Sequence, residues 1–355
     1  MLSQINKYHI NDKKGGIEIV SSQIADLIKI DHDIYFGEEK KLSNQLRIYK
    51  VLFTFLSQPV SMGYLRDVLK VSKTSNKIII HLPNPLPLLI LTFAIYLFRK
   101  SKPKIFLFWH ADTPMLAKPM AYLLSVLNRY SELKICVTSY EYLQSSRQLK
   151  NYEDLVKIIP LAIKKRPFQN EKRGLNSNEP LKIIIIGRLV RYKGIIEFLE
   201  ALEYQQINAD VKICGRGPLA QKISNKIKIT KYPSIELLQD VSDLQKLALL
   251  EESDLLVLPS NTRQEAFGVV LIEALERGLP IAVNSDNKGS GMLEVCKDGY
   301  NGFHFTLSHL KTLINRYRSK SNNDLNTLRL AAREDFEKRF STETFDRNIR
   351  EWLEI

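Results

Sequence analysis

Apolar and polar residues alternate along this chain in blocks of two lengths. Short apolar runs of strand length are separated by helix-length segments, of which residues 115–128 are one example. Strands that alternate with helices are typical of parallel α/β sheets. The strand-like runs are residues 77–82, 105–109 and 135–138 in the first half and residues 181–186, 211–214, 255–259 and 280–284 in the second half. The pattern therefore predicts two α/β halves.

The division between the halves falls at residues 164–180. This segment (KKRPFQNEKRGLNSNEP) is polar and contains two prolines, which favours a loop. We therefore expect a linker here, between an N-terminal domain over residues 1–163 and a C-terminal domain over residues 181–335. A chain of 355 residues is long for a single core, which agrees with two domains of similar size. After residue 302 the pattern predicts helix as far as Trp352.

Two carboxylates near Gly268 need partners. Glu273 is surrounded by apolar residues, so a helix that starts near Gly268 would be apolar almost all round and buried. An unpaired buried carboxylate costs several kcal/mol, so Glu273 either pairs with Arg277 one turn further on or binds a ligand diol such as a ribose. Glu265 precedes the helix, where backbone N–H groups point outward and can donate to ligand oxygens; an ordinary N-terminal acid is the alternative.

A second group of charges follows the apolar run of residues 181–186. Arg188, Arg191 and Lys193 crowd the carboxyl end of this predicted strand. Ligands of open α/β sheets bind outside the carboxyl ends of the strands, and Arg and Lys suit phosphate oxygens there. A solvated basic loop is the alternative interpretation. The P-loop pattern G-x-x-x-x-G-K-[ST] does not occur in the sequence.

These two motifs occur in an order and at a spacing that match a known family. Gly187-Arg188-x4-Lys193-Gly194 and Glu265-x-Phe267-Gly268-x4-Glu273-Ala274 together resemble the retaining glycosyltransferases of family 4, also described as glycosyl transferases group 1. Further matches are Gly15-Gly16-Ile17-Glu18, Ile159-Pro160-Leu161-Ala162-Ile163 and Asp298-Gly299-Tyr300-Asn301-Gly302-Phe303. The resemblance extends over nearly the whole chain. It implies the GT-B fold, with two Rossmann-like domains facing a central inter-domain cleft and a C-terminal helix, residues 336–355, that returns to the N-domain.

The resemblance also implies roles for individual residues. Arg188 and Lys193 would bind the diphosphate of a nucleotide sugar and stabilise it as the leaving group, and Glu265 would contact the donor sugar. Glu273 would hold the ribose hydroxyls. The donor-binding residues that the resemblance implies are Gly15, Gly16, Phe267, Gly268 and Glu273. An ordinary turn is the alternative for Gly15 and Gly16.

Two histidines compete for a place at the catalytic centre. His110 lies in Phe108-Trp109-His110-Ala111-Asp112, which resembles a tryptophan-histidine-serine-aspartate segment of some family members with Ala111 in place of the serine. We prefer His110 as the residue near the donor sugar or acceptor and His81 as the second choice. Asp112 would orient His110 or bind acceptor. A structural role remains the alternative for each histidine.

The sequence gives little support for a metal or another cofactor. Asp31-His32-Asp33 has the Asp-x-Asp form of metal-dependent transferases, but so short a motif is common by chance and precedes a strand-like run at residues 34–36. We expect no metal and no cofactor besides the nucleotide sugar substrate. The three cysteines lie far apart in apolar runs, which predicts buried reduced thiols and fits a reducing cytoplasm.

The net charge of +13 needs a partner beyond one diphosphate. No nucleic-acid-binding pattern accompanies it, so we expect no nucleic acid partner. An anionic membrane surface is the more economical partner. The most apolar segment, residues 86–98, is shorter than the ~20 residues of a spanning helix, so it is either a core helix or an apolar patch at a membrane interface. The first twenty residues lack the apolar region of a signal peptide, which favours the cytoplasm, with peripheral contact at the inner face of the cell membrane as the alternative.

The resemblance predicts a retaining hexosyltransferase that uses a nucleotide diphosphate sugar and a lipid-linked or growing cell-surface glycan. Mannose from GDP-mannose is preferred, because the His81 and Trp109-His110 segments are similar to those of mannosyl members. The alternative is a catalytically silent nucleotide-sugar-binding or membrane-scaffold subunit of a glycan assembly complex. Two departures from the family pattern are a short first strand, residues 2–6, and Ser290-Gly291 in place of a double glycine.

Overall fold

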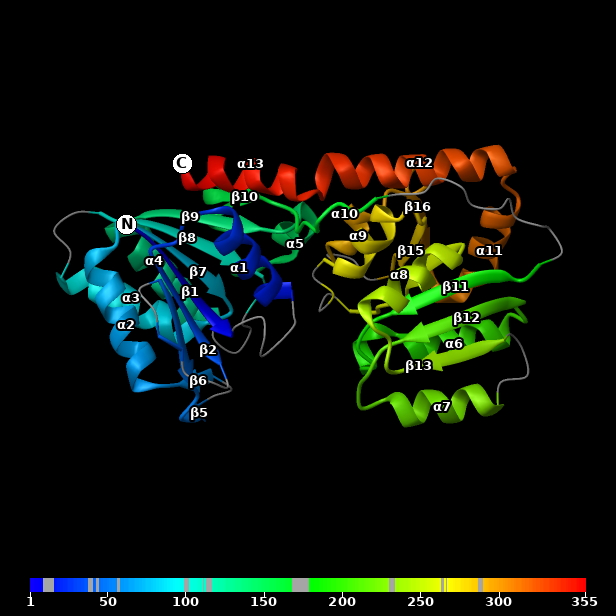
Figure 1. The fold of residues 1–355 in the computed structure, drawn as a ribbon, viewed down its shortest axis with the longest axis horizontal. Helices are drawn as coiled ribbons and strands as arrows, with labels where there is room; N and C mark the ends of the chain where they lie inside the picture. The colour runs from blue at the N-terminus through cyan, green and yellow to red at the C-terminus, as the bar shows by residue number, and fades with distance from the viewer. Residues whose placement is uncertain are drawn as a thin grey trace. The chain divides into compact units, whose positions relative to one another are not determined.

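The chain folds into two compact units. A computed structural model describes residues 1–8, 16–37, 41–42, 45–55, 58–98, 102–110, 112, 117–167, 179–229, 234–262, 265, 267–286 and 290–355. The N-terminal unit consists of Met1–Pro160 and Asp346–Ile355, and the C-terminal unit consists of Leu161–Phe345 (Figure 1). Each unit is built on its own sheet.

The N-terminal unit contains an eight-stranded sheet in the order β10-β9-β8-β7-β1-β2-β4-β3. Its strands are β1 (Leu2–Tyr8), β2 (His32–Gly37), β3 (Lys41–Leu42), β4 (Leu46–Lys50), β7 (Lys77–Leu82), β8 (Lys104–Trp109), β9 (Glu132–Val137) and β10 (Val156–Ile158). All neighbouring strands are parallel except β3 and β4. A separate hairpin pairs β5 (Phe53–Phe55) with β6 (Gln58–Val60). The predicted strands at residues 77–82, 105–109 and 135–138 are confirmed.

Helices connect these strands. They are α1 (Gly16–Leu27), α2 (Met62–Thr74), α3 (Pro85–Phe98), α4 (Ala117–Tyr130) and α5 (Tyr140–Ser145), with a 3-10 turn at Glu153–Leu155. Helix α3 is the segment predicted at residues 86–98, and it contributes only one face to the core. Leu88, Leu91 and Ile95 are buried, whereas Phe93 and Tyr96 are exposed. None of the described helices is both long enough and apolar enough to cross a bilayer.

Two expectations about the first strands are wrong. Strand β1 extends to Tyr8, because Tyr8 still pairs with Phe36 of β2. Strand β2 begins at His32, so Asp33 belongs to the strand instead of preceding it. The side chain of Asp33 is buried and accepts hydrogen bonds from its neighbours in the sheet.

The C-terminal unit contains a fully parallel six-stranded sheet in the order β13-β12-β11-β14-β15-β16. Its strands are β11 (Leu181–Ile186), β12 (Ala209–Cys214), β13 (Ile235–Leu238), β14 (Leu255–Leu258), β15 (Ile281–Asn284) and β16 (Gly302–Phe305). The four strands that the sequence predicts here are confirmed. The prediction of helix directly after residue 302 is wrong, because β16 first pairs with β15 and buries Phe303.

Helices pack around this second sheet. They are α6 (Ile195–Tyr204), α7 (Ala220–Ile229), α8 (Asp243–Glu252), α9 (Val269–Glu276), α10 (Met292–Val295), α11 (Leu310–Arg318) and α12 (Asn322–Arg339), with 3-10 turns at Arg191–Lys193 and Leu307–His309. Strand β11 is buried in the middle of the sheet, which explains its nearly continuous apolar sequence. All three cysteines of the chain are buried free thiols, as the sequence predicts.

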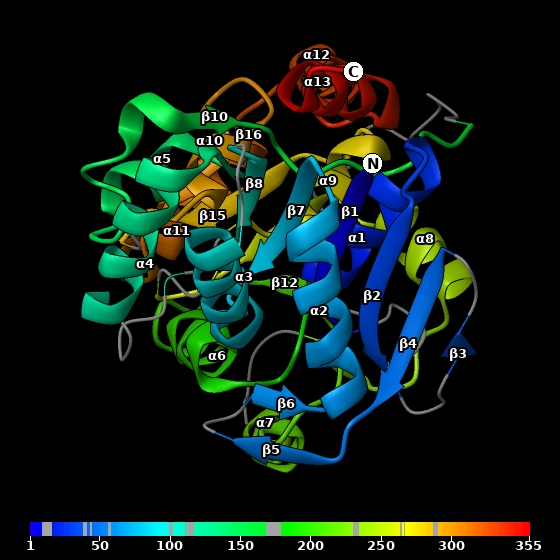
Figure 2. The same cartoon turned by 90° about the vertical axis from the view of Figure 1, so that its left-hand side faces the viewer.

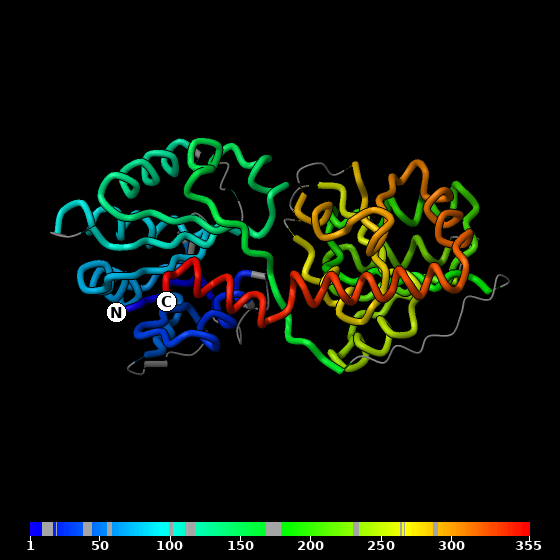
Figure 3. Tube along the Cα trace, turned by 90° about the horizontal axis from the view of Figure 1, so that it is seen from above, coloured from blue at the N-terminus to red at the C-terminus, as the bar shows by residue number. Residues whose placement is uncertain are grey.

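The end of the chain belongs to the N-terminal unit. Helix α13 (Thr342–Leu353) begins in the C-terminal unit, and its last residues pack in the N-terminal unit. Trp352 there meets Phe106 edge-on, with 5.2 Å between the ring centroids. The two ends of the chain lie near each other in this unit (Figure 3), and Lys77 donates from Nζ to the Leu353 carbonyl oxygen and from its backbone to that of Met1.

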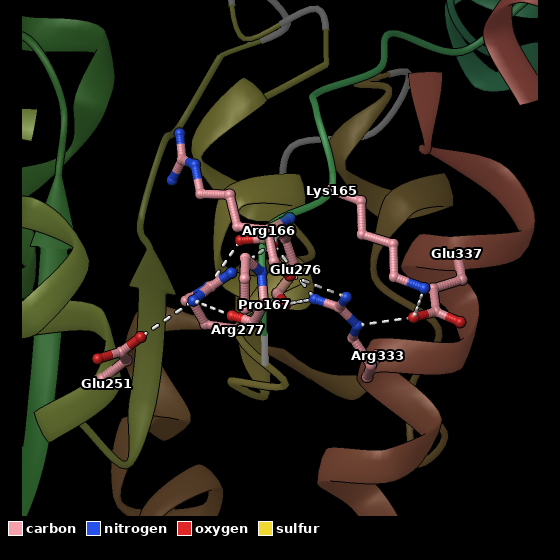
Figure 4. A network of polar contacts seen from close by, with 8 residues as sticks. All are labelled: Lys165, Arg166, Pro167, Glu251, Glu276, Arg277, Arg333 and Glu337. Carbon is pink, nitrogen blue, oxygen red and sulfur yellow. Dashed lines mark hydrogen bonds and ion pairs between the residues drawn. The ribbon is translucent and has the colours of Figure 1, made fainter. Parts of the chain in front are cut away.

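A buried charge network fixes the end of helix α9 in the C-terminal unit (Figure 4). Glu276 is fully buried, and its carboxylate binds the guanidinium of Arg277 and lies 3.3 Å from Nη1 of Arg333 on α12. The same carboxylate accepts a 2.7 Å hydrogen bond from the backbone N–H of Arg166. Arg277 in turn donates to the carbonyl oxygen of Pro167 at 3.0 Å. One carboxylate therefore joins α9, α12 and the segment at residues 165–167.

We expect Glu276→Ala to lower the free energy of unfolding by about 3–5 kcal/mol, because two arginine side chains would lose a buried partner. Glu251→Ala is the matched control, since Glu251 binds Arg277 from a side chain that is 57% exposed. This control should cost at most about 1 kcal/mol. Urea unfolding of the full chain, followed by circular dichroism, measures both. Equal losses in the two variants would contradict a structural role for the buried carboxylate.

Candidate functional site

The loop after β11 approaches the loop after β14 in the C-terminal unit. Gly194 ends the 3-10 turn of this first loop with a left-handed φ of 67°. A Cβ atom added at Gly194 would lie 2.2 Å from the carbonyl oxygen of Pro259, so no other residue fits without movement of the backbone. Glycine therefore permits the two loops to meet at the carboxyl edge of the sheet.

An ion pair forms where these loops meet. Nζ of Lys193 binds Oε2 of Glu265, and each residue is only 8% exposed. The hydroxyl of Ser260 lies 3.4 Å from the same carboxylate oxygen, and the hydroxyl of Ser290 donates to the Glu265 carbonyl oxygen. The sequence predicts Lys193 and Glu265 as site residues, and the structure brings them together. Each charge is the partner that makes burial of the other tolerable.

Arg188 lies on the same loop as Lys193 and is exposed. Its guanidinium donates a 3.2 Å hydrogen bond to the hydroxyl of Tyr192. The Lys193 side chain packs against Gly187, where an added Cβ would lie 3.3 Å from Nζ. The exposed guanidinium of Arg188 and the buried ammonium group of Lys193 thus follow the carboxyl end of β11, a position at which α/β sheets bind anions.

Helix α9 follows Glu265 in the chain and begins with Gly268 as its N-cap. Gly268 has a left-handed φ of 83° and provides no side chain to cap the helix. Phe267 before it is buried and meets Phe340 edge-on at 5.9 Å between centroids. The first backbone N–H groups of a helix have no partner within the helix, so those of α9 can donate to ligand oxygens.

Glu273 has a partner that the sequence did not identify. One carboxylate oxygen, Oε1, lies 2.8 Å from Nζ of Lys246 on α8, and the side chain is 18% exposed. The alternative of an ion pair with Arg277 is wrong, because Arg277 binds Glu276 and Glu251 instead. The expectation of a helix buried all round is also wrong, since Val269 and Val270 are partly exposed.

In the N-terminal unit the two candidate histidines contact each other. Nδ1 of His81 lies 3.0 Å from Nε2 of His110, and the rings stack with 5.3 Å between centroids. Phe108 stacks on both rings. Burial lowers the pKa of His110 to about 3, and burial together with the neighbouring His110 lowers the pKa of His81 well below its usual value. Both imidazoles are therefore neutral at physiological pH.

The remaining predicted residues lie as follows. Asp112 accepts hydrogen bonds from Trp109, Tyr142 and Ser146, and His110 contacts His81. Gly16 is the first residue of α1, and Gly15 lies outside the described residues. Within the described ranges, no group of three or more His, Cys, Asp or Glu side chains is arranged to hold a metal ion.

Residues 166–335 match the family model described as Glycosyl transferases group 1. The matched residues make up most of the C-terminal unit. The chain is 23% identical to O-antigen chain mannosyltransferase C of Escherichia coli over 357 aligned residues. The alignment covers 96% of this chain and 94% of that protein. The chain is 27% identical to D-rhamnosyltransferase WbpZ of Pseudomonas aeruginosa over 167 residues, 46% of this chain and 43% of that protein.

Solved structures share the fold of the whole chain. The lipopolysaccharide outer core galactosyltransferase WaaB superimposes with a TM-score of 0.72 at 14% identity over 99% of both chains. The Anabaena protein HepE in complex with UDP superimposes with a TM-score of 0.71 at 16% identity over 100% of both chains. These likenesses confirm the predicted GT-B fold, with two Rossmann-like α/β units.

We expect the Lys193–Glu265 pair to show strong energetic coupling in the absence of any ligand. Lys193→Met and Glu265→Gln should each lower the free energy of unfolding by about 3–5 kcal/mol, because each leaves a buried group without its partner. The double variant should lose less than the sum of the two, since neither charge then remains. Urea unfolding of the four proteins measures this cycle. Arg188→Ala, at an exposed site, should change stability by no more than about 0.5 kcal/mol. Simple additivity of the two substitutions would contradict the pair.

Proposed function

We propose that this chain is a retaining glycosyltransferase that moves a hexose, with mannose preferred, from a nucleotide diphosphate sugar to a lipid-linked or growing cell-surface glycan. The observation that carries the proposal is the buried Lys193–Glu265 pair beside exposed Arg188 and the uncapped start of α9. The similarity to an O-antigen mannosyltransferase supports the sugar and the class of glycan. The UDP bound in the HepE structure supports a nucleotide diphosphate donor.

The proposed donor changes the partner of Lys193. A diphosphate carries more negative charge than one carboxylate, so it competes with Glu265 for the Lys193 ammonium group. Arg188 binds the same phosphates through its two-pronged guanidinium. Glu265 is then released to accept hydrogen bonds from hydroxyls of the donor sugar. The backbone N–H groups of Phe267 and Gly268 donate to oxygens of the same sugar. Glu273 binds the ribose diol with the carboxylate oxygen that Lys246 leaves available.

Transfer then exchanges one bond at the anomeric carbon for another. The bond to the phosphate oxygen breaks, the acceptor hydroxyl bonds to the same face of the sugar, and its proton passes to the departing diphosphate. Negative charge therefore grows on the leaving group, where Arg188 and Lys193 stabilise it. In this proposal the carboxylates position the donor and do not protonate it, because a diphosphate leaves without that help.

Arg188→Ala should lower kcat by about 10²–10³-fold, the usual effect of removing one group aimed at developing charge. Thermal melting of the parent chain with UDP-, GDP-, ADP- and TDP-sugars identifies the donor first. Saturation at a hundred times the dissociation constant adds about 2.7 kcal/mol of stability, and we expect GDP-mannose to produce this shift. For the kcat of Arg188→Ala, the control is Arg318→Ala, because Arg318 binds backbone carbonyl oxygens of Glu179 and Asn208 at the opposite edge of the sheet. A parent chain that no sugar nucleotide stabilises would overturn the proposed function.

We also propose that the N-terminal unit meets its acceptor at an anionic membrane. Helices α2, α3 and α4 lie side by side (Figure 2), and we call their solvent side the three-helix surface. Helix α3 contributes an apolar stripe to it, with Leu89 52%, Phe93 60% and Tyr96 56% exposed. An open groove of about 570 Å³ between α3 and α4 is lined by these three side chains together with Tyr122 and Arg129. An apolar stripe of this kind on a helix surface marks a binding site.

Cations border the apolar stripe. Arg66, Lys70 and Lys73 follow one face of α2, and Nζ of Lys73 lies 4.1 Å from the ring centroid of Phe98 on α3. Arg129 lines the groove on the other side. The three helices contain a single acid, Asp67, and it is buried. Apolar side chains flanked by cations suit the boundary between anionic headgroups and acyl chains.

The double substitution Phe93→Ser/Tyr96→Ser should weaken binding to vesicles of phosphatidylglycerol and phosphatidylcholine by tenfold or more, because each aromatic ring contributes about 1.5–3 kcal/mol when it is buried in lipid. Co-sedimentation of the full chain at low salt measures the affinity. Tyr204→Ser is the control, since Tyr204 is 89% exposed on the C-terminal unit. Unaltered vesicle binding by the double variant would exclude the three-helix surface as the contact.

A further inference from the structure

A chain of buried hydrogen bonds crosses four neighbouring strands of the N-terminal sheet. It begins at Asp33 on β2, passes through Gln4 on β1 and His81 on β7, and ends at His110, directly after β8. Backbone register places Gln4 opposite Asp33 and His81 opposite Phe108. Because side chains two residues apart share a face of a strand, all four groups lie on one face of the sheet. Gln4 and His81 are almost completely buried.

The contacts of Gln4 determine which way its amide points. Its Nε2 lies 3.0 Å from the carbonyl oxygen of Ser21 and 3.1 Å from Oδ1 of Asp33. The carbonyl oxygen of Ser21 only accepts, so the NH₂ group of Gln4 must face it, with Oδ1 of Asp33 on the same side. Its Oε1 therefore faces Nε2 of His81, at 3.3 Å. Since this oxygen only accepts, Nε2 of His81 carries a proton.

The same reasoning extends to His110. A neutral His81 with its proton on Nε2 has an unprotonated Nδ1, which accepts from Nε2 of His110 at 3.0 Å. A neutral His110 with its proton on Nε2 then has its lone pair on Nδ1. His110 is partly exposed as a residue, and no described residue is hydrogen-bonded to that Nδ1. The lone pair is thus available to a ligand.

We propose that Gln4 and His81 are positioning residues that hold His110 in the tautomer with its proton on Nε2, so that Nδ1 accepts a hydrogen bond from a hydroxyl of the sugar substrates. The identity of that hydroxyl rests on the proposed glycosyl transfer, whereas the tautomer is a property of the protein alone. Asp33 anchors the far end of the chain, where it also accepts from Asn6 at 3.0 Å and Tyr35 at 2.8 Å. The assignment gives His110 the role of a neutral acceptor.

Nuclear magnetic resonance of the ligand-free chain, labelled with ¹⁵N in its histidines, tests the tautomer directly. Long-range proton–nitrogen spectra distinguish a protonated from an unprotonated ring nitrogen, and the spectra of His81→Phe and His110→Phe assign the two rings. We expect both rings to carry the proton on Nε2 only. Gln4→Leu should convert His81 and His110 to mixtures of tautomers, whereas Gln148→Leu, at another buried glutamine of this unit, should leave them unchanged. A His110 protonated on Nδ1 in the parent chain would overturn the proposal.

A kinetic experiment separates this inference from the proposed function. With the donor that stabilises the parent chain, Gln4→Leu should lower kcat about tenfold, the effect of one hydrogen bond, and leave KM for the donor unchanged. A tenfold rise in KM for the donor with no change in kcat would contradict the positioning role. If no sugar nucleotide binds the parent chain, the proposed function fails while the tautomer result stands. If donors bind but Gln4→Leu alters neither kcat nor the spectra, only the positioning role fails.

Discussion

The candidate donor site depends on one buried carboxylate, that of Glu276 at the end of helix α9. A fully buried charge is tolerated only with partners of opposite charge, and Arg277 and Arg333 supply them. Because these partners belong to α9 and α12, and because the backbone of Arg166 binds the same carboxylate, the helix is held at its carboxyl end. The rest of the helix, from its N-cap Gly268 through Glu273, is thereby held in place.

The charges of the site itself differ from this structural network. Glu276 is fully buried and binds two arginine side chains that are themselves buried, so its contacts serve the fold. Lys193 and Glu265 satisfy each other at the carboxyl edge of the sheet, on the same loop region as exposed Arg188. In the function that we propose, this ion pair keeps the buried lysine charged before the donor arrives and releases the carboxylate once the donor has bound.

In the N-terminal unit, buried polar groups also satisfy one another, but the two histidines there are neutral. Burial keeps both His81 and His110 uncharged, so hydrogen bonds alone decide where their protons lie. The amide of Gln4 has a fixed direction because the Ser21 carbonyl oxygen beside its NH₂ group only accepts, and this direction determines the proton positions on His81 and then on His110. On the solvent side of the same unit, α3 has too many apolar residues for the single face that it buries. The excess forms the exposed stripe between basic helices.

The sequence by itself determined the parallel α/β class, most of the strands and the motifs around Arg188 and Glu265, because local apolar runs and glycine positions carry that information. It did not determine how far β1 extends or that β16 follows Asn301, since strand ends depend on partners distant in the chain. Pairing was decided only by the tertiary structure: Lys193 with Glu265, Glu273 with Lys246, His81 with His110. A charged or polar side chain in an apolar segment shows that a partner must exist, and only the fold decides which residue comes within reach.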